Sequence, residues 1–229
     1  MPQGASWERE YRNPQFLTKD AEPQIDTKRF LRFLGSKQGL TLEGIRVLDL
    51  GSGTGRNANY IAALGNSVEG LEISVTAVRL AQERAKALGV DAHFRVADMG
   101  VEYPFADQSF EIVIDVTSSN SLNEKERAVY LQEILRVLKP GGYLFVKALC
   151  KDGDQNAKKL LKISPGKEHD TYINKDLDLV ERVFSQEDFR DLYGKHFKIL
   201  ELSKKTNYTR FKGQSYKRNF WLAYMQKSE

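Results

Sequence analysis

The chain has 229 residues and a net charge of +4, and its 41% hydrophobic and 10% aromatic residues exclude intrinsic disorder over most of its length. Its single cysteine, Cys150, and its three histidines are too few for a disulfide framework or a Cys/His zinc site, so we expect no metal site. No apolar run approaches the roughly 18–20 residues of a membrane span, and the N-terminus lacks the layout of a signal peptide. These features predict a cytoplasmic protein without a membrane partner.

Strand and helix patterns alternate from residue 25 onward. Periodicity and end signals predict helices at 25–34, 56–64, 74–88, 123–138 and 185–193. Strands are predicted at 45–50, 68–73, 92–97, 110–116, 143–149, 197–202 and 220–225. Their alternation implies an α/β fold with a mostly parallel sheet of seven strands, helices on both faces and an antiparallel last strand.

The length fits one domain, which we place at 1–229. It divides into an N-terminal helical cap (1–40), a ligand-binding core (41–150), a polar lid or substrate insertion (151–182), and a C-terminal helix with antiparallel strands (183–229). Ligands of such sheets bind at the carboxyl ends of the parallel strands.

A glycine cluster, Asp49-Leu-Gly51-Ser-Gly53-Thr-Gly55, follows the first predicted strand directly. Glycines here allow a tight turn and close approach of the backbone to a ligand. The dinucleotide fingerprint requires a third glycine at position 56, where Arg56 stands, and a Walker loop requires Gly-Lys-Ser/Thr, which Gly55-Arg56-Asn57 does not supply. A tight turn without a ligand remains the alternative reading.

The pattern D-x-G-x-G-x-G resembles motif I of the class I S-adenosylmethionine-dependent methyltransferases, with further matches at Glu72, at Asp98-Met99 and at the approach to the fifth strand. The resemblance covers residues 45–149 closely and 185–225 more loosely. It implies a Rossmann-like fold and S-adenosylmethionine as cofactor, with S-adenosylhomocysteine as product. Glu72 would then bind the ribose, and Asp98 and Met99 the adenine. The cofactor residues it implies are Tyr11, Asp49, Gly51, Ser52, Gly53, Gly55, Asn57, Glu72, Ile73, Asp98, Met99, Asp115 and Val116.

Each of these residues also has a purely structural reading. Glu72 is a possible solvated strand end with Glu69 as a rival acid, Asp98 a helix cap, and Tyr11 and Trp7 core anchors. Because several positions match the family pattern together, we favour the cofactor-binding interpretation over the structural one.

The sequence indicates less about the methyl acceptor, because methyl transfer depends mainly on positioning the acceptor and requires no particular catalytic residue. After the fourth strand the chain reads Asp115-Val-Thr117-Ser-Ser-Asn120, without the Asn-Pro-Pro-Tyr of many base-amine methyltransferases. Cys150 is expected to be a buried apolar residue. Substrate contacts are expected from Thr117, Asn120, Lys151 and Tyr172, and the candidate acid–base groups are His169, Tyr172 and Asp115.

Basic residues concentrate at 195–218, in a segment that also contains aromatic side chains. We read it as a solvated hairpin, although it also suits an RNA surface. A small-molecule acceptor is the favoured expectation. The alternatives are an RNA or protein methyltransferase and a catalytically inert cofactor-binding partner protein. The sequence does not indicate an oligomeric state.

Overall fold

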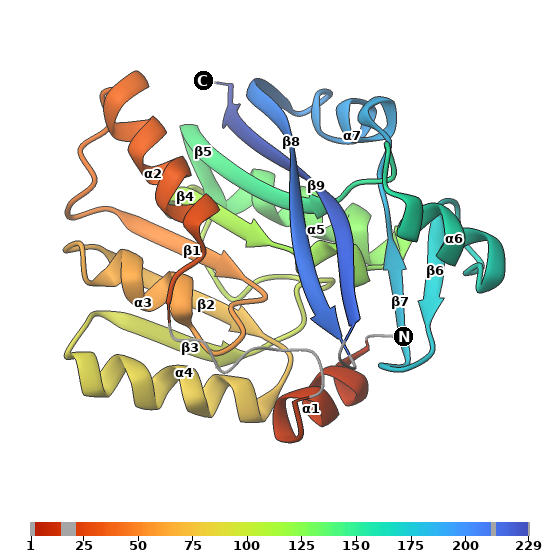
Figure 1. Cartoon of the computed structure of the whole chain (residues 1–229). Coiled ribbons are helices and arrows are strands. Elements are labelled where there is room, and N and C mark those ends of the chain that lie inside the picture. Colours follow the sequence, from red (N-terminus) through yellow and green to blue (C-terminus); the bar gives the residue numbers. More distant parts are fainter. Residues whose placement is uncertain (1–2, 15–21, 212–213, 229) are drawn as a thin grey trace.

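A seven-stranded sheet in the order β3-β2-β1-β4-β5-β9-β8 forms the centre of the molecule (Figure 1). The computed structural model describes residues 3–14, 22–211 and 214–228. The first five strands pair in parallel, and β9 pairs antiparallel with both β5 and β8. The strands are β1 (Arg46–Leu50), β2 (Ser67–Glu72), β3 (Ala92–Val96), β4 (Phe110–Val116), β5 (Leu138–Leu149), β8 (Phe197–Phe211) and β9 (Gln214–Lys227). The predicted fold class is confirmed, including the antiparallel last strand.

Helices cover both faces of the sheet and create two apolar cores. On one face, α2 (Ile25–Lys37), α3 (Arg56–Ala62) and α4 (Val75–Leu88) pack through residues such as Phe30, Ile61 and Ala81. On the other, α5 (Glu124–Val137) and α7 (Gln186–Tyr193) pack through residues such as Tyr130 and Phe189. Burial of these apolar faces is the main stabilising contribution.

Polar caps fix the helix ends where the sequence predicts them. The side chain of Ser74 accepts from the backbone N–H of Ala77 at the start of α4. Asn123 and Glu126 form a reciprocal capping box at α5, and Ser185 does the same with Asp188 at α7. The Ser74 cap closely follows the end of β2, and the Asn123 cap ends the loop after β4, so both caps help to fix the loops at the carboxyl edge of the sheet.

Three segments differ from the predicted pattern. Strand β5 begins at Leu138 rather than Tyr143, because Leu138 pairs with Phe110 before a register shift. The insertion at 151–182 contains a helix, α6 (Gln155–Ile163), and a separate hairpin of β6 (Thr171–Asn174) and β7 (Leu179–Arg182). The two terminal strands are much longer than predicted.

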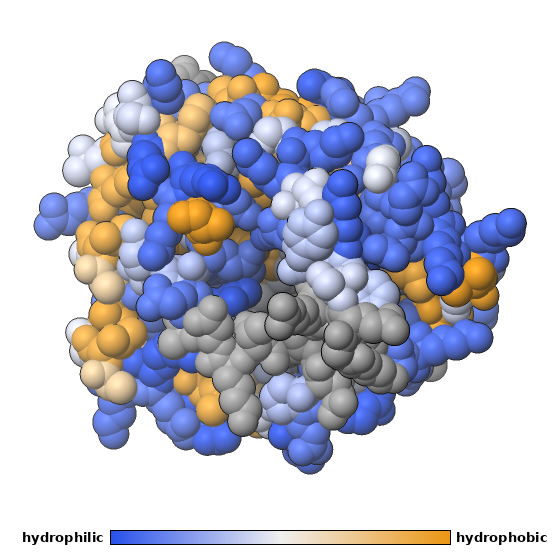
Figure 2. Space-filling view, viewed as in Figure 1, coloured by the Kyte–Doolittle hydropathy of each residue, from blue (hydrophilic) through white to orange (hydrophobic). Residues whose placement is uncertain are grey.

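The β8–β9 hairpin extends past the carboxyl edge of the sheet. Strand β5 pairs with β9 only from Phe220 to Gln226, so the first part of β9, with the part of β8 that pairs with it, extends beyond the end of β5. Arg210 and Lys212, both in the predicted basic segment, lie outside the described side chains. Figure 2 shows a mainly hydrophilic face, with hydrophobic residues along the edge nearest α3 and α4 and smaller groups at the top of the view and near α6.

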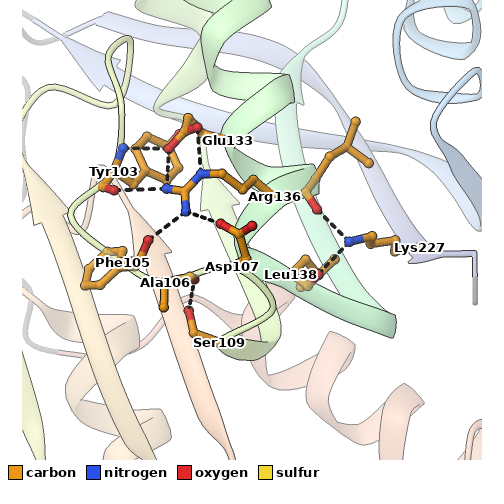
Figure 3. Close-up of polar contacts among 10 residues, drawn as sticks. Tyr103, Phe105, Ala106, Asp107, Ser109, Glu133, Arg136, Leu138 and Lys227 are labelled. Atoms are coloured by element: carbon orange, nitrogen blue, oxygen red, sulfur yellow. Dashed lines mark hydrogen bonds and ion pairs between the residues drawn. The ribbon is translucent and has the colours of Figure 1, made fainter.

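Arg136, in the last turn of α5, fastens the loop between β3 and β4 (Figure 3). Its guanidinium pairs with Glu133 and Asp107 and donates to the carbonyls of Tyr103 and Phe105. Beside it, the ammonium of Lys227 donates to the Leu135 and Leu138 carbonyls at the end of α5. None of the helices in the described residues is long and apolar enough to cross a membrane.

Candidate cofactor and acceptor site

A cavity of about 560 Å³ lies where β1, β2 and β4 end, and the N-terminal helix α1 (Gly4–Arg12) forms part of its wall. Most of the predicted cofactor residues line it, as does the predicted substrate residue Thr117. They are Tyr11, Asp49, Gly51, Ser52, Gly53, Asn57, Glu72, Ile73, Asp98, Met99 and Val116. Side chains distant in the sequence therefore meet at the edge of the sheet where ligands of this architecture bind.

Two positions in the glycine loop leave no room for a side chain. Gly51 has φ +65°, and a Cβ there would lie 2.3 Å from the Ser118 side chain. Gly53 has φ +54°, and a Cβ there would lie 2.7 Å from the Tyr11 hydroxyl oxygen. Both the backbone conformation and the crowding favour glycine, which brings bare backbone to the cavity wall.

Glu72 fixes this loop from the end of β2. One carboxylate oxygen accepts from the N–H of Gly53 at 3.0 Å, and the other accepts from the N–H of Ser74 at 2.8 Å. Burial nevertheless raises the pKa of Glu72. Each oxygen keeps a further lone pair, so the carboxylate can also accept from a ligand hydroxyl.

Asp49 is a buried carboxyl with an orphaned oxygen. Its Oδ2 has no hydrogen-bond partner, and neither has the Oγ of Ser52, which also lines the cavity. Burial, followed by repulsion from Asp115 and Glu72, raises the pKa of Asp49 to about 8. Three carboxyl groups therefore lie close together behind the glycine loop, and a cationic ligand would favour the ionised form of Asp49.

Helix α1 covers the loop through Tyr11, which is held against Gly53. Burial raises the pKa of the Tyr11 phenol well above its ordinary value, so the phenol stays protonated. The carboxylate of Glu8 accepts hydrogen bonds from Ser74 and Thr76 at the start of α4. These contacts attach the N-terminal cap to the core beside the cavity.

The adenine-side candidates lie after β3. Asp98 accepts from the N–H of Gly100 at 2.8 Å, and the Met99 carbonyl accepts from the Tyr103 hydroxyl at 3.1 Å. Both residues also line the cavity.

The loop after β4 contains a strained residue. Thr117 has φ +68°, which a β-branched side chain rarely adopts. Buried Asp115 lies beneath the loop and accepts from the N–H of Ser118, the N–H of Ser119 and the Tyr130 hydroxyl. Asp115 thus shapes the loop without lining the cavity, and burial raises its pKa.

The remaining predicted residues also lie outside the cavity lining. Gly55 begins α3, and Asn120 accepts from the Leu149 N–H at 2.9 Å. Tyr172 is fully buried and contacts Glu181 and Arg218. Lys151 and His169 both lie against Asp170. Together with Asp188, His169 and Asp170 bring ligand atoms within 4.8 Å of one another, but Lys151 compensates Asp170 directly.

Residues 47–142 match the family model described as a methyltransferase domain. The demethylmenaquinone methyltransferase of Renibacterium salmoninarum is 34% identical over 130 residues, which are 57% of this chain and 52% of that protein. The phthiotriol/phenolphthiotriol dimycocerosates methyltransferase 1 of Mycobacterium ulcerans is 30% identical over 141 residues, which are 61% of this chain and 50% of that protein. The chain thus spans about half the length of these relatives.

The solved structure of an S-adenosylmethionine-dependent methyltransferase from Methanosarcina mazei aligns with a TM-score of 0.73 at 25% identity, covering 83% of this chain and 96% of that one. Residues 47–142 thus form a methyltransferase domain, and the chain has the fold of the class I, Rossmann-like methyltransferases. Its cofactor is S-adenosylmethionine. The orphaned Asp49 oxygen and the bare Gly53 backbone fit this cofactor, whose sulfonium is a cation.

The sequence did not indicate several of the residues that line this cavity. Gln24 lines it, donates its N–H to Asn57 Oδ1 at 2.9 Å and accepts from the buried Lys147 ammonium at 3.0 Å. Lys147 also pairs with buried Asp26. Gln3 also lines the cavity and donates to the Ser121 carbonyl. Isolated glutamines give no sequence signal. Ser118 and Ser121, by contrast, stand in the loop after β4 that sequence analysis already singled out.

Proposed function

We propose that the chain transfers the methyl group of S-adenosylmethionine to a small-molecule acceptor. The observation that carries this proposal is the buried carboxyl of Asp49, which faces the cavity behind a glycine loop closed by Tyr11. When bound, the cofactor supplies an electrophilic methyl group on a sulfonium. The chain's own residues bind and orient it.

The binding residues fall into three groups along the cavity. Asp49, Gly51, Ser52 and Gly53 would hold the methionine end, with Tyr11 over it. Glu72 and Ile73 would hold the ribose. Asp98 and Met99 would hold the adenine. This assignment follows the positions of the residues at the ends of β1, β2 and β3.

Thr117, Ser118 and Ser121 follow Val116 on the cavity wall and are the proposed acceptor contacts. They are hydrogen-bonding groups without acid–base strength near neutral pH. The candidate acid–base groups His169 and Tyr172 lie outside the cavity lining. We infer that catalysis rests on positioning the acceptor in line with the methyl group.

Two features support a small acceptor. A volume of about 560 Å³ falls within the range typical of small-molecule sites. Both similar proteins are named for small molecules rather than for nucleic acids or proteins.

A macromolecular acceptor has one observation in its favour. The β8–β9 hairpin projects beyond the carboxyl edge of the sheet, with exposed Lys217 on its projecting part and exposed Lys204 and Lys205 at its base. This cationic hairpin suits an anionic polymer such as RNA.

Calorimetric titration with S-adenosylmethionine tests the cofactor assignment. We expect the wild type to bind, and Glu72→Ala with Asp98→Ala to weaken binding at least about tenfold, which corresponds to about 1.4 kcal/mol. Glu69→Ala is the matched control, since this acid stands on the same strand but pairs with Arg95 outside the cavity. Equal affinity in the double variant and the wild type would overturn the assignment.

Methyl-labelled cofactor, incubated separately with a metabolite extract, RNA and protein, tests the acceptor class. We expect label in the metabolite fraction. Label only in RNA would favour the hairpin hypothesis, and cofactor binding without any transfer would favour an inert partner protein.

A further inference from the structure

Two arginines stack on one buried aromatic ring on the side of the sheet covered by α5 and α7. The guanidinium carbon of Arg127 lies 5.1 Å from the ring centroid of Phe184, and that of Arg182 lies 5.0 Å from it. Arg127 comes from α5, and Arg182 is the last residue of β7. Two like charges are therefore held beside one apolar side chain.

These charges lack an acidic partner. Arg127 is 2% exposed, and its terminal nitrogens donate to the neutral carbonyls of Ser119 at 2.8 Å and Leu122 at 2.7 Å. The Nε atoms of Arg127 and Arg182 are both buried without a hydrogen-bond partner. Over residues 3–14, 22–211 and 214–228, no carboxylate forms an ion pair with either guanidinium. Burial lowers the pKa of Arg127 and the Arg182 charge adds to this effect, whereas Tyr193, Tyr130 and Asp115 oppose it. A buried charge without an ion-pair partner is costly, and a bound anion would reduce that cost.

A cavity of about 520 Å³ opens beside the two guanidiniums, and both arginines line it. Its apolar wall includes Leu131, Leu135 and Leu192, from α5 and α7. Exposed Ala128 also lines it, and exposed Glu124, Gln132 and His196 are its other polar lining residues. The cavity thus combines a cationic end with an aliphatic surface.

We propose that this cavity binds an amphipathic anion, with a phosphate or carboxylate headgroup at Arg127 and Arg182 and an aliphatic portion on the leucine wall. Guanidinium groups match both headgroups because their planar N–H donors bind two oxygens at once. The leucine wall favours an attached aliphatic chain over a bare inorganic ion, since only the chain buries apolar surface. Glu124 disfavours a second negative group on the ligand.

This site is separate from the methyltransferase cavity, although Arg127 connects the two. Arg127 holds the carbonyls of Ser119 and Leu122, and Leu122 lines the methyltransferase cavity. Among the described residues, none lines both cavities. A ligand of the arginine site therefore need not compete with the cofactor.

Calorimetric titration of the full chain with decyl phosphate and with decanoate, each below its micelle concentration, tests the proposal. We expect saturable binding of at least one of them, weakened at least about tenfold in Arg182→Gln and in Leu192→Ser. Arg182 is chosen because it is only partly buried, so its replacement is less disruptive than that of Arg127. Arg190→Gln, on α7 but outside the lining of this cavity, is the matched control.

Comparisons with other ligands test whether binding needs both the anionic headgroup and the aliphatic chain, and whether it occurs outside the cofactor cavity. Inorganic phosphate should bind at least about tenfold more weakly than decyl phosphate, and decyltrimethylammonium should not bind. S-adenosylhomocysteine should neither displace decyl phosphate nor lose affinity in Arg182→Gln, which also reports that the variant is folded. Undiminished binding in Arg182→Gln, equal binding of the cationic amphiphile, or absence of binding by both anions would overturn the proposal. Displacement by S-adenosylhomocysteine would assign the anion to the cofactor cavity and equally overturn it.

Discussion

The carboxylate of Glu8 accepts a 2.6 Å hydrogen bond from the hydroxyl of Ser74, the residue that caps α4. It also accepts from the N–H of Thr76 at 3.1 Å and from the Thr76 hydroxyl at 2.7 Å. These bonds, the one from Ser74 foremost, lower the pKa of Glu8 to about 2. A single side chain of α1 thus supplies acceptors to the helix that follows the proposed ribose-binding strand.

Glu8→Gln should loosen α1 and weaken cofactor binding roughly three- to tenfold, because charged acceptors form stronger hydrogen bonds than amides do. Since the pKa of Glu8 is lowered in the folded state, its contribution should be complete above about pH 4.5 and lost as the pH falls toward 2. Calorimetry and protease sensitivity of α1 would measure both effects. Glu83→Gln, which breaks an exposed pair with Arg79, is the control, and equal behaviour of the two variants would contradict the prediction.

Because the pKa of Asp49 is raised to about 8, the preference of the protein for S-adenosylmethionine over S-adenosylhomocysteine should depend on pH. A sulfonium favours the ionised carboxylate, whereas the thioether of S-adenosylhomocysteine has no such charge. The ratio of S-adenosylmethionine to S-adenosylhomocysteine affinity should therefore rise between about pH 7 and pH 9 as Asp49 ionises. Taking the ratio cancels the amino group that both ligands share. Asp49→Asn should flatten the profile, and a ratio independent of pH in the wild type would refute this role.

Gly53→Ala should reduce cofactor affinity at least about tenfold, because its Cβ would lie 2.7 Å from the Tyr11 hydroxyl oxygen at φ +54°. Adding Tyr11→Phe should restore part of the loss by removing that oxygen. Gly89→Ala is the control, since Gly89 has φ +65° but no atom within 4 Å of the place where a Cβ would lie. It should cost about 1 kcal/mol of stability without affecting binding. Comparable affinity losses in both variants would point to a general backbone effect.

Thr117→Gly should raise the free energy of unfolding by about 1 kcal/mol while lowering methyl transfer, since the strained backbone would relax. Urea denaturation and turnover would be measured together. Gln108→Gly provides the same relief from φ +49° in a loop outside the cavity lining, and it should leave turnover unchanged. Unaltered turnover in Thr117→Gly would show that its geometry is unrelated to the reaction.

Lys227→Met should destabilise the fold by about 1–2 kcal/mol, because two carbonyls at the end of α5 would lose a charged donor (Figure 3). The midpoint of urea unfolding would report the loss. Lys125→Met, at the exposed start of the same helix, should have little effect. Identical midpoints in the two variants would argue against the cap.

Local chemistry explains which parts of the structure were predictable. The glycine loop, the Ser74 cap and the Asn123–Glu126 box each depend on residues within a few positions of one another. The contacts of the N-terminal cap do not. Glu8 meets Ser74 across 66 positions, and Gln3 meets Val180 across 177.

Side-chain type alone also did not indicate which residues line the cavity. Lys151, Tyr172 and His169 were candidates because their chemistry suits a base or a ligand contact, yet their partners are Asp170, Glu181 and Arg218. The Tyr172–Glu181 pairing arises from the β6–β7 hairpin, which the polar sequence of 151–182 did not reveal, and Arg218 comes from β9. Thr117, which lines the cavity, was a candidate because it directly follows a recognisable strand.

The position of β9 between β5 and β8 has a consequence for folding. The strand furthest along the chain fills an interior place in the sheet, so β5 presents an unpaired edge until β8 and β9 have formed and docked. Unpaired edges of apolar strands are sites of intermolecular association. The Phe145 and Val146 segment, buried in the finished sheet, is therefore where misassembly between copies should begin if hairpin docking is slowed.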